Sequence, residues 1–283
     1  MTAEAPPVAG SPGTGSSAGV LVAFGGEGPG GLLADTWVFA DGAWKLLHPA
    51  TSPPARYGAS FAYDPTARQD ILFGGIGAGG LPLDDTWAWD GSNWVELHPA
   101  ASPPARSAAA FAYGPIRRGA LAGMALPVTA KVPAGSGISG TSQAGGPSAD
   151  FPQSRGDGGH GLVLFGGRSA SGAPLAGTWA WNGANWVKLA PATSPPARSA
   201  AAFAYGPIPH RSPPAYRPPA SATSRGSAHG ASQGSPPKST AAPGDHGHGD
   251  ILFGGSGTSG LLGGTWAWNG ANWVKLAPAT SPP

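Results

Sequence analysis

The triplet Phe-Gly-Gly occurs four times, and its spacing constrains the fold more than any other feature of the chain. The triplets begin at Phe24, Phe73, Phe165 and Phe253. Their separations are therefore 49, 92 and 88 residues. The two long separations contain stretches rich in Gly, Pro, Ser and Ala, which begin after Ile116 and after Ile208. The spacing indicates four repeats of about 50 residues, with two insertions at the same place in the repeat.

Each repeat is predicted to contain four short strands, which we call a, b, c and d. In the second repeat they are residues 59–63, 70–75, 85–90 and 93–97. Trp87 and Trp89 alternate along strand c, which is typical of a strand with one face in a core. Asp90-Gly91 is a hairpin turn signal between c and d. We therefore predict an antiparallel four-stranded sheet for each repeat.

Two tryptophans separated by six residues recur at the same place in every repeat. The pairs are Trp37/Trp44, Trp87/Trp94, Trp179/Trp186 and Trp266/Trp273. A surface on which sugars or bases stack is one interpretation. Packing between sheets is the interpretation that we prefer, because a side chain repeated in one register serves the repeat itself and an indole buries a large apolar area.

The apolar run ending in Gly-Gly and the spaced tryptophans resemble a known family of repeats. The segment "GTWAWNGANWVKLAPATSPPAR" (177–198) is similar to the kelch-like repeats of bacterial proteins related to the galactose oxidase central domain. This resemblance implies an all-β, kelch-type β-propeller, in which four-stranded sheets (blades) are arranged radially. Four repeats correspond to about four blades.

Strand a is expected only three times, at 59–63, 108–112 and 200–204. Kelch-like propellers commonly close with a C-terminal strand a that joins the N-terminal blade. We therefore expect the closing strand to be missing and strand b of the first blade, 20–24, to have an unpaired apolar edge. Three outcomes are open: the N-terminal tail folds back, a second copy pairs there so that the protein self-associates, or the chain is a fragment of a larger propeller.

Composition separates the repeats from the rest of the chain. The 283 residues include 48 glycines and 33 prolines, a level typical of low-complexity or turn-dense sequence, but also 11 tryptophans, which disordered chains lack. We predict a disordered tail at 1–19, a propeller domain at 20–283, and disordered a–b insertions at about 117–160 and 209–249.

Repeated arginines are candidates for a binding face formed by the b–c and d–a loops. Arg56, Arg106 and Arg198 each end a Pro-Pro-Ala-Arg segment. A guanidinium offers a planar fork to a carboxylate. The alternative, which we prefer, is that each arginine anchors the turn into strand a by bonding backbone carbonyls.

Histidines supply weak metal-ligand candidates. His48 and His98 occupy the same position in adjacent repeats and complete the predicted binding face. His246 and His248 lie near the end of the second insertion. No third ligand accompanies His48 and His98, whereas Asp245 and Asp250 flank His246 and His248, which suits adventitious metal binding and not a catalytic site. We predict no metal and no cofactor.

The sequence favours a binding protein over an enzyme. It has no cysteine, whereas galactose oxidase chemistry, as the resemblance implies it, needs a Tyr–Cys crosslink; no other catalytic constellation is evident. We predict a non-enzymatic scaffold that presents b–c and d–a loops to a protein or glycan. The alternatives are a propeller fragment without independent function and a metal-dependent carbohydrate-active enzyme related to galactose oxidase.

The remaining partner classes follow from what the sequence lacks. No basic run predicts specific nucleic-acid binding. Neither a signal peptide nor an apolar stretch of membrane-spanning length is present in the sequence. The default expectation is therefore a cytoplasmic protein, with a secreted or cell-surface protein as the alternative.

Overall fold

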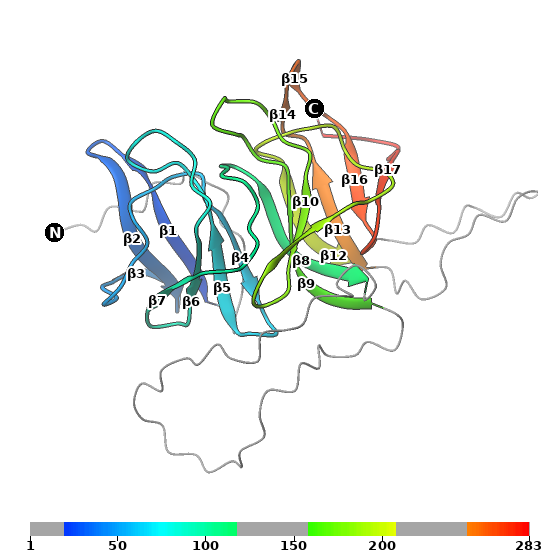
Figure 1. Cartoon of the computed structure of the whole chain (residues 1–283). Helices are drawn as coiled ribbons and strands as arrows, with labels where there is room; N and C mark the ends of the chain where they lie inside the picture. Colours follow the sequence, from blue (N-terminus) through cyan, green and yellow to red (C-terminus); the bar gives the residue numbers. More distant parts are fainter. Residues whose placement is uncertain (1–19, 118–157, 208–247, 283) are drawn as a thin grey trace, which may run out of the picture.

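The computed structural model of the chain describes residues 20–117, 158–207 and 248–282, which form only strands and turns (Figure 1). Four antiparallel sheets follow one another along the chain, from β1–β3 in blue to the sheet of β12–β17, in which β12 is yellow and the later strands are orange to red. The all-β class and the repeated four-stranded sheets predicted from the sequence are confirmed. The predicted tail, most of both insertions and His246 lie outside the described residues.

The first sheet has three strands, and the next three sheets have four. The first contains β1 (Leu21–Gly28), β2 (Gly31–Ala40) and β3 (Ala43–Leu47). The second contains β4 (Ser60–Asp64), β5 (Gln69–Phe73), β6 (Thr86–Trp89) and β7 (Trp94–Leu97). The third contains β8 (Ala110–Arg117), β9 (Gly158–Phe165), β10 (Thr178–Trp181) and β11 (Trp186–Leu189). The fourth contains β12 (Ala202–Pro207), β13 (His248–Phe253), β16 (Thr265–Trp268) and β17 (Trp273–Leu276), and a small hairpin, β14 (Ser256–Gly257) and β15 (Gly260–Leu261), lies between β13 and β16.

The turn between strands c and d forms as its sequence predicts. Trp89 pairs with Trp94 at the end of the β6–β7 ladder. The Asp90 carboxylate accepts hydrogen bonds from the backbone N–H groups of Ser92 and Asn93, and Gly91 has a positive φ of 97°. A short polar side chain that bonds the backbone two residues on is what makes Asp and Asn favourable in such turns.

Two predicted boundaries of strand a were wrong. β8 and β12 begin at Ala110 and Ala202, two residues later than predicted, because Ala108 and Ala200 have left-handed backbones with φ of 51° and 52°. Both strands also extend further than predicted.

Backbone pairing includes a few residues of both predicted insertions. Backbone pairing continues the β8–β9 ladder to Arg117 and Gly158 and the β12–β13 ladder to Pro207 and His248. His248 is therefore part of β13. Pairing of main-chain groups does not require the apolar side chains from which the strands were predicted.

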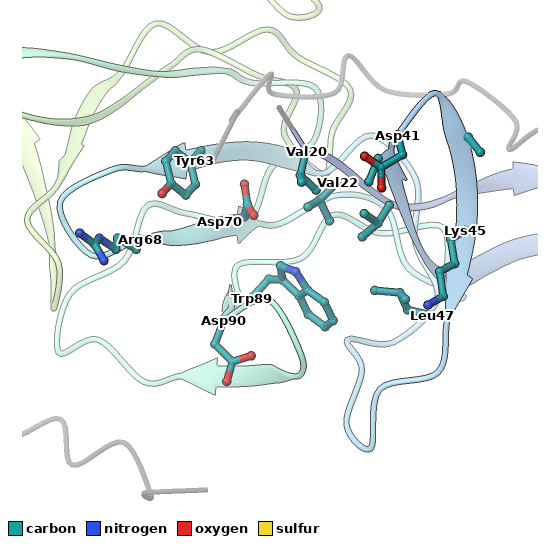
Figure 2. Close-up of a pocket in the computed structure, with 14 residues that line it drawn as sticks. Val20, Val22, Asp41, Lys45, Leu47, Tyr63, Arg68, Asp70, Trp89 and Asp90 are labelled. Carbon is teal, nitrogen blue, oxygen red and sulfur yellow. The ribbon is translucent and has the colours of Figure 1, made fainter. Parts of the chain in front are cut away.

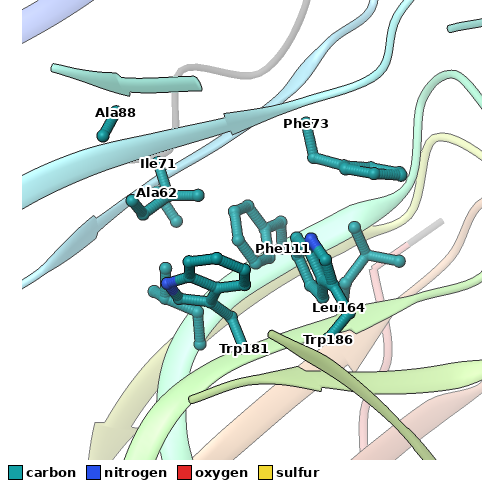
Figure 3. Close-up of a cluster of buried hydrophobic side chains, with 9 residues drawn as sticks. Ala62, Ile71, Phe73, Ala88, Phe111, Leu164, Trp181 and Trp186 are labelled. Carbon is teal, nitrogen blue, oxygen red and sulfur yellow. The ribbon is translucent and has the colours of Figure 1, made fainter. Parts of the chain in front are cut away.

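Apolar clusters fill each space between neighbouring sheets. Figure 3 shows the cluster between the second and third sheets, where Trp186 lies against Phe73, Phe111 and Trp181. Equivalent clusters join the first sheet to the second and the third to the fourth. Seven of the eleven tryptophans are buried: Trp87, Trp89, Trp94, Trp181, Trp186, Trp268 and Trp273. Of the eight tryptophans in the predicted pairs, packing between sheets is confirmed for the four that are buried, Trp87, Trp94, Trp186 and Trp273, whereas Trp44 is 38% exposed.

A repeated hydrogen bond ties neighbouring sheets together inside these clusters. The indole N–H of Trp94 donates to the Thr36 hydroxyl over 2.9 Å. Trp186 bonds Thr86, and Trp273 bonds Thr178, each over 3.0 Å. Each bond gives a buried indole N–H its partner and joins one sheet to the sheet before it.

The first sheet differs from the others as predicted, because it has no strand a. Within the described residues β1 pairs only with β2 and forms the edge of its sheet, and no strand pairing joins the first sheet to the fourth. Self-association through β1 stays a prediction.

Candidate functional site

The connections between strands gather at two ends of the sheets. The b–c and d–a connections of the second to fourth sheets form one end, which we call the loop face: residues 48–59, 74–85, 98–109, 166–177, 190–201 and 254–264. β14 and β15 mark this end at the top of Figure 1. The a–b and c–d turns lie at the opposite end, which we call the turn face. All five residues of the predicted binding face belong to the loop face: His48, Arg56, His98, Arg106 and Arg198.

Arg56 anchors the loop face of the second sheet. Its side chain is fully buried, and Nε donates to the Pro54 carbonyl over 2.9 Å while Nη1 donates to the Gly74 carbonyl over 3.0 Å. Nη1 and Nη2 also bond the two oxygens of Asp85, over 2.5 and 2.7 Å. The guanidinium therefore fastens the d–a connection to the b–c loop, which is the anchoring role that we preferred.

Arg106 and Arg198 make the same carbonyl contacts in the third and fourth sheets. Arg106 donates to the carbonyls of Pro104 and Gly166, each over 2.9 Å. Arg198 donates to those of Pro196 and Gly254, over 3.1 and 2.7 Å. Both side chains are buried, and burial lowers the pKa of Arg106 to about 10 and lowers the pKa of Arg198. Neither arginine has a salt bridge to a described residue, because glycines (177 and 264) stand where the second sheet has Asp85.

Backbone hydrogen bonds join the loops of successive sheets. The Gly75 N–H donates to the Arg106 carbonyl over 3.0 Å, and the Arg106 N–H donates to the Leu83 carbonyl over 3.0 Å. A Cβ on Gly74 would overlap the Arg106 carbonyl oxygen, which explains why Phe-Gly-Gly must carry glycine there. The loop face is thus held in one conformation by the main chain and by the buried arginines.

Exposed leucines stand on these fixed loops, and the sequence reasoning missed them. Leu81 is 61% exposed and Leu261 is 92% exposed. Both lie seven residues after the first glycine of Phe-Gly-Gly, where the third sheet has the exposed Ala173 and the first sheet the half-buried Leu32. The recurrence of leucine inside an otherwise Gly-rich loop is the sequence signal that would have identified them.

His48 and His98 do not belong to a metal-binding cluster of the described residues. His48 and His98 are both exposed, each near the start of a d–a connection. Among residues 20–117, 158–207 and 248–282, no group of three His, Cys, Asp or Glu side chains is placed to hold a metal ion.

A pocket lies at the turn face, between the first and second sheets, and has a volume of about 560 Å³ (Figure 2). None of the predicted site residues lines it. Its walls are Val20, Val22, Val38, Ala40, Asp41, Ala43, Lys45, Leu47, Tyr63, Arg68, Asp70, Trp89, Asp90 and Gly91. Asp70 pairs with Trp89, the last tryptophan of strand c in the second sheet. Leu162 pairs with Trp181 in the same way and therefore corresponds to Asp70 in the third sheet, where it is fully buried.

Asp70 and Asp90, two of the three aspartates that line this pocket, differ in the direction of their pKa shifts. Burial raises the pKa of Asp70 to about 7. Burial also opposes ionisation of Asp90, but hydrogen bonds from Asn93 and Ser92 outweigh it, so the pKa of Asp90 is lowered. Asp70 can therefore hold or release a proton near neutral pH, while Asp90 stays ionised.

No protein-family model matches the chain, and no curated protein matches it either. Within the described residues, no helix is long and apolar enough to cross a membrane.

Proposed function

We propose that the chain is a binding scaffold of the kelch-type β-propeller kind, without an enzymatic role, that presents its b–c and d–a loops to a partner. The exposure of Leu81 and Leu261 on the loop face carries this proposal. Leucines on the surface normally occur singly, but these two lie in the b–c loops of two sheets, at the same end of the molecule.

The fixed conformation of the loops supports binding at this face. A loop that is ordered before it meets a partner loses little conformational freedom on binding, so more of the contact free energy remains as affinity. Buried Arg56, Arg106 and Arg198, together with the backbone bonds between successive loops, provide that order. The arginines thus contribute to the site by positioning loops.

A protein partner fits this face better than a glycan. Apolar side chains surrounded by polar backbone are the usual anchors of a protein interface. Sugars are held by exposed aromatic rings, and the rings repeated in this chain are mostly buried between sheets. Glycan binding remains an outcome that the experiment below distinguishes.

The test is a selection of ligands by the purified full-length chain, from a random peptide library and from a glycan array. The affinity of each selected ligand is measured by calorimetry for the chain itself and for Leu81→Asp/Leu261→Asp. Val95→Asp/Val274→Asp is the matched control, because these valines are 42% and 45% exposed but lie on β7 and β17. We expect peptides to be selected and the leucine variant to bind them at least tenfold more weakly. Equal weakening in both variants, or ligands that are only glycans, would contradict the proposal.

A separate measurement tests the propeller itself. Light scattering after size exclusion gives the mass of the chain in solution. A compact monomer near 27.9 kDa supports closure within one chain, and a defined dimer supports pairing through β1. Heterogeneous aggregate supports the alternative, a propeller fragment without independent function.

A further inference from the structure

The second sheet neutralises its buried guanidinium with a carboxylate, and the next two sheets do not. Asp85 accepts two hydrogen bonds from Arg56, and its Oδ2 accepts a third from the Trp87 indole N–H over 2.8 Å. This Arg–Asp pair is the only salt bridge that the described residues form. The carboxylate thus sits among three donors, a strong arrangement for an anion.

The same kinds of donor lie beside Gly177 in the third sheet. An ideal Cβ built on Gly177 would lie 3.1 Å from Trp179 Nε1 and 4.0 Å from Arg106 Nη1, with no backbone atom among its three nearest neighbours. Trp179 Nε1 has no hydrogen-bond partner among the described residues. Arg106 is only 3% exposed and donates to the carbonyls of Pro104 and Gly166, which correspond to those that Arg56 bonds. The third sheet therefore retains the donors of the second and lacks only the anion.

The fourth sheet repeats the glycine, the tryptophan and the buried arginine, but no Arg198 atom lies within 4 Å of an ideal Cβ on Gly264. An ideal Cβ on Gly264 would lie 3.2 Å from Trp266 Nε1, and the buried Arg198 bonds the carbonyls of Pro196 and Gly254. The feature thus recurs in two sheets, whose segments 177–196 and 264–283 are identical in sequence.

Solvent reaches these positions. The Asp85 side chain, which occupies the position in the second sheet, is 21% exposed. Gly177 and Gly264 are themselves partly exposed. A buried guanidinium without a counter-charge is costly in a low-dielectric surrounding, and an anion that enters from the loop face relieves that cost.

We propose that Arg106 with Trp179, and Arg198 with Trp266, form two carboxylate-binding sites on the loop face. Each site accepts one carboxylate group in the place where the second sheet carries its own Asp85, with the guanidinium and the indole N–H as donors. The group comes either from a small free carboxylate or from a peptide carboxylate. This proposal does not depend on the proposed function, because it concerns a group that binds without Leu81 or Leu261.

The test follows the indole N–H signals of the full-length chain by ¹⁵N–¹H NMR during titration with formate and then acetate. Chloride is the control at matched ionic strength, and single Trp→Phe variants assign the signals. We expect saturable shifts of the Trp179 and Trp266 signals and none of the Trp87 signal, whose N–H already bonds Asp85. Absence of shifts, or equal shifts with chloride, would overturn the proposal.

Substitutions within the repeat sharpen this test. Gly177→Asp supplies the missing carboxylate, so it should abolish the response of Trp179 and leave that of Trp266 unchanged; Gly264→Asp should do the reverse. Asp85→Gly should make the Trp87 signal respond to formate, and this gain is a readout that general loss of structure cannot produce. Responses that persist unchanged in the two aspartate variants place the anion elsewhere and refute the assignment.

A final arm distinguishes the two sources. A short acetylated peptide with a free C-terminal carboxylate is compared with its C-terminal amide and with formate. Shifts by the free peptide at tenfold lower concentration than by formate indicate a peptide carboxylate, whereas shifts by formate alone indicate a small free carboxylate. Equal shifts by the amide would contradict carboxylate recognition.

Discussion

Trp186 should be among the most costly side chains in the protein to remove. It is fully buried between the second and third sheets, where its ring centroid lies 5.0 Å from that of Phe73 and 5.6 Å from that of Phe111. Truncation of a buried aromatic to alanine removes its transfer free energy and leaves a cavity, which together cost about 3–5 kcal/mol. We expect Trp186→Ala to lower the free energy of unfolding by that amount.

Part of this cost belongs to the hydrogen bond with Thr86. Thr86→Val keeps the shape of the side chain but removes the oxygen that accepts the indole N–H over 3.0 Å. A buried donor left without a partner costs about 1–3 kcal/mol. The contribution of the bond can therefore be measured without a large cavity.

The chain supplies its own control for the tryptophan. Trp44 occupies the same position in the first sheet, where no sheet precedes it in the described structure, and it is 38% exposed. We expect Trp44→Ala to cost about 1 kcal/mol or less, as surface substitutions do. Unfolding in guanidinium chloride is followed by far-UV circular dichroism, because tryptophan fluorescence changes with the substitutions. Equal costs for Trp44→Ala and Trp186→Ala, or no cost for Thr86→Val, would refute packing between sheets as the role of the repeated tryptophan.

Three further predictions concern backbone and carboxyl groups. Burial raises the pKa of Asp70 to about 7, so the folded chain keeps a proton that the unfolded chain loses above about pH 4. The free energy of unfolding should therefore fall between pH 4 and 7. Thermal melts of Asp70→Asn should show a smaller slope of stability against pH over this range. Gly58 and Ala108 have left-handed backbones with φ of 62° and 51°. In denaturant titrations Ala108→Gly should stabilise the chain and Gly58→Ala should destabilise it, each by up to about 1 kcal/mol. Opposite signs would contradict backbone strain at Ala108. A Cβ on Gly114 would overlap the Asp250 carboxyl group, so Gly114→Ala should cost about 1–3 kcal/mol, and calorimetry should show that adding Asp250→Gly recovers most of it.

Much of the architecture could be predicted from local sequence. The Phe-Gly-Gly spacing defines the repeat, the alternation of Trp87 and Trp89 defines strand c, and Asp90-Gly91 defines the turn, because each depends on backbone preferences and side-chain periodicity over a few residues. The recurrence of Trp94 and Trp186 was enough to predict burial. The boundary at Ala108 was not, since alanine gives no local sign of a left-handed backbone.

The candidate site depended on contacts between distant segments. The arginines were identified from the sequence, but their environments were not: Arg56 meets its carboxylate 29 residues away, and the equivalent position beside Arg106 holds glycine. The pocket at the turn face was missed because Asp70 looks like any polar residue at the start of a strand, and its raised pKa arises only where the first and second sheets enclose it. The sequence alone determined the repeat, its strands and its turns, because those follow from neighbours along the chain. Only the tertiary structure decided which charges are buried, which are paired and which are left without a partner, because that depends on which sheet packs against each face.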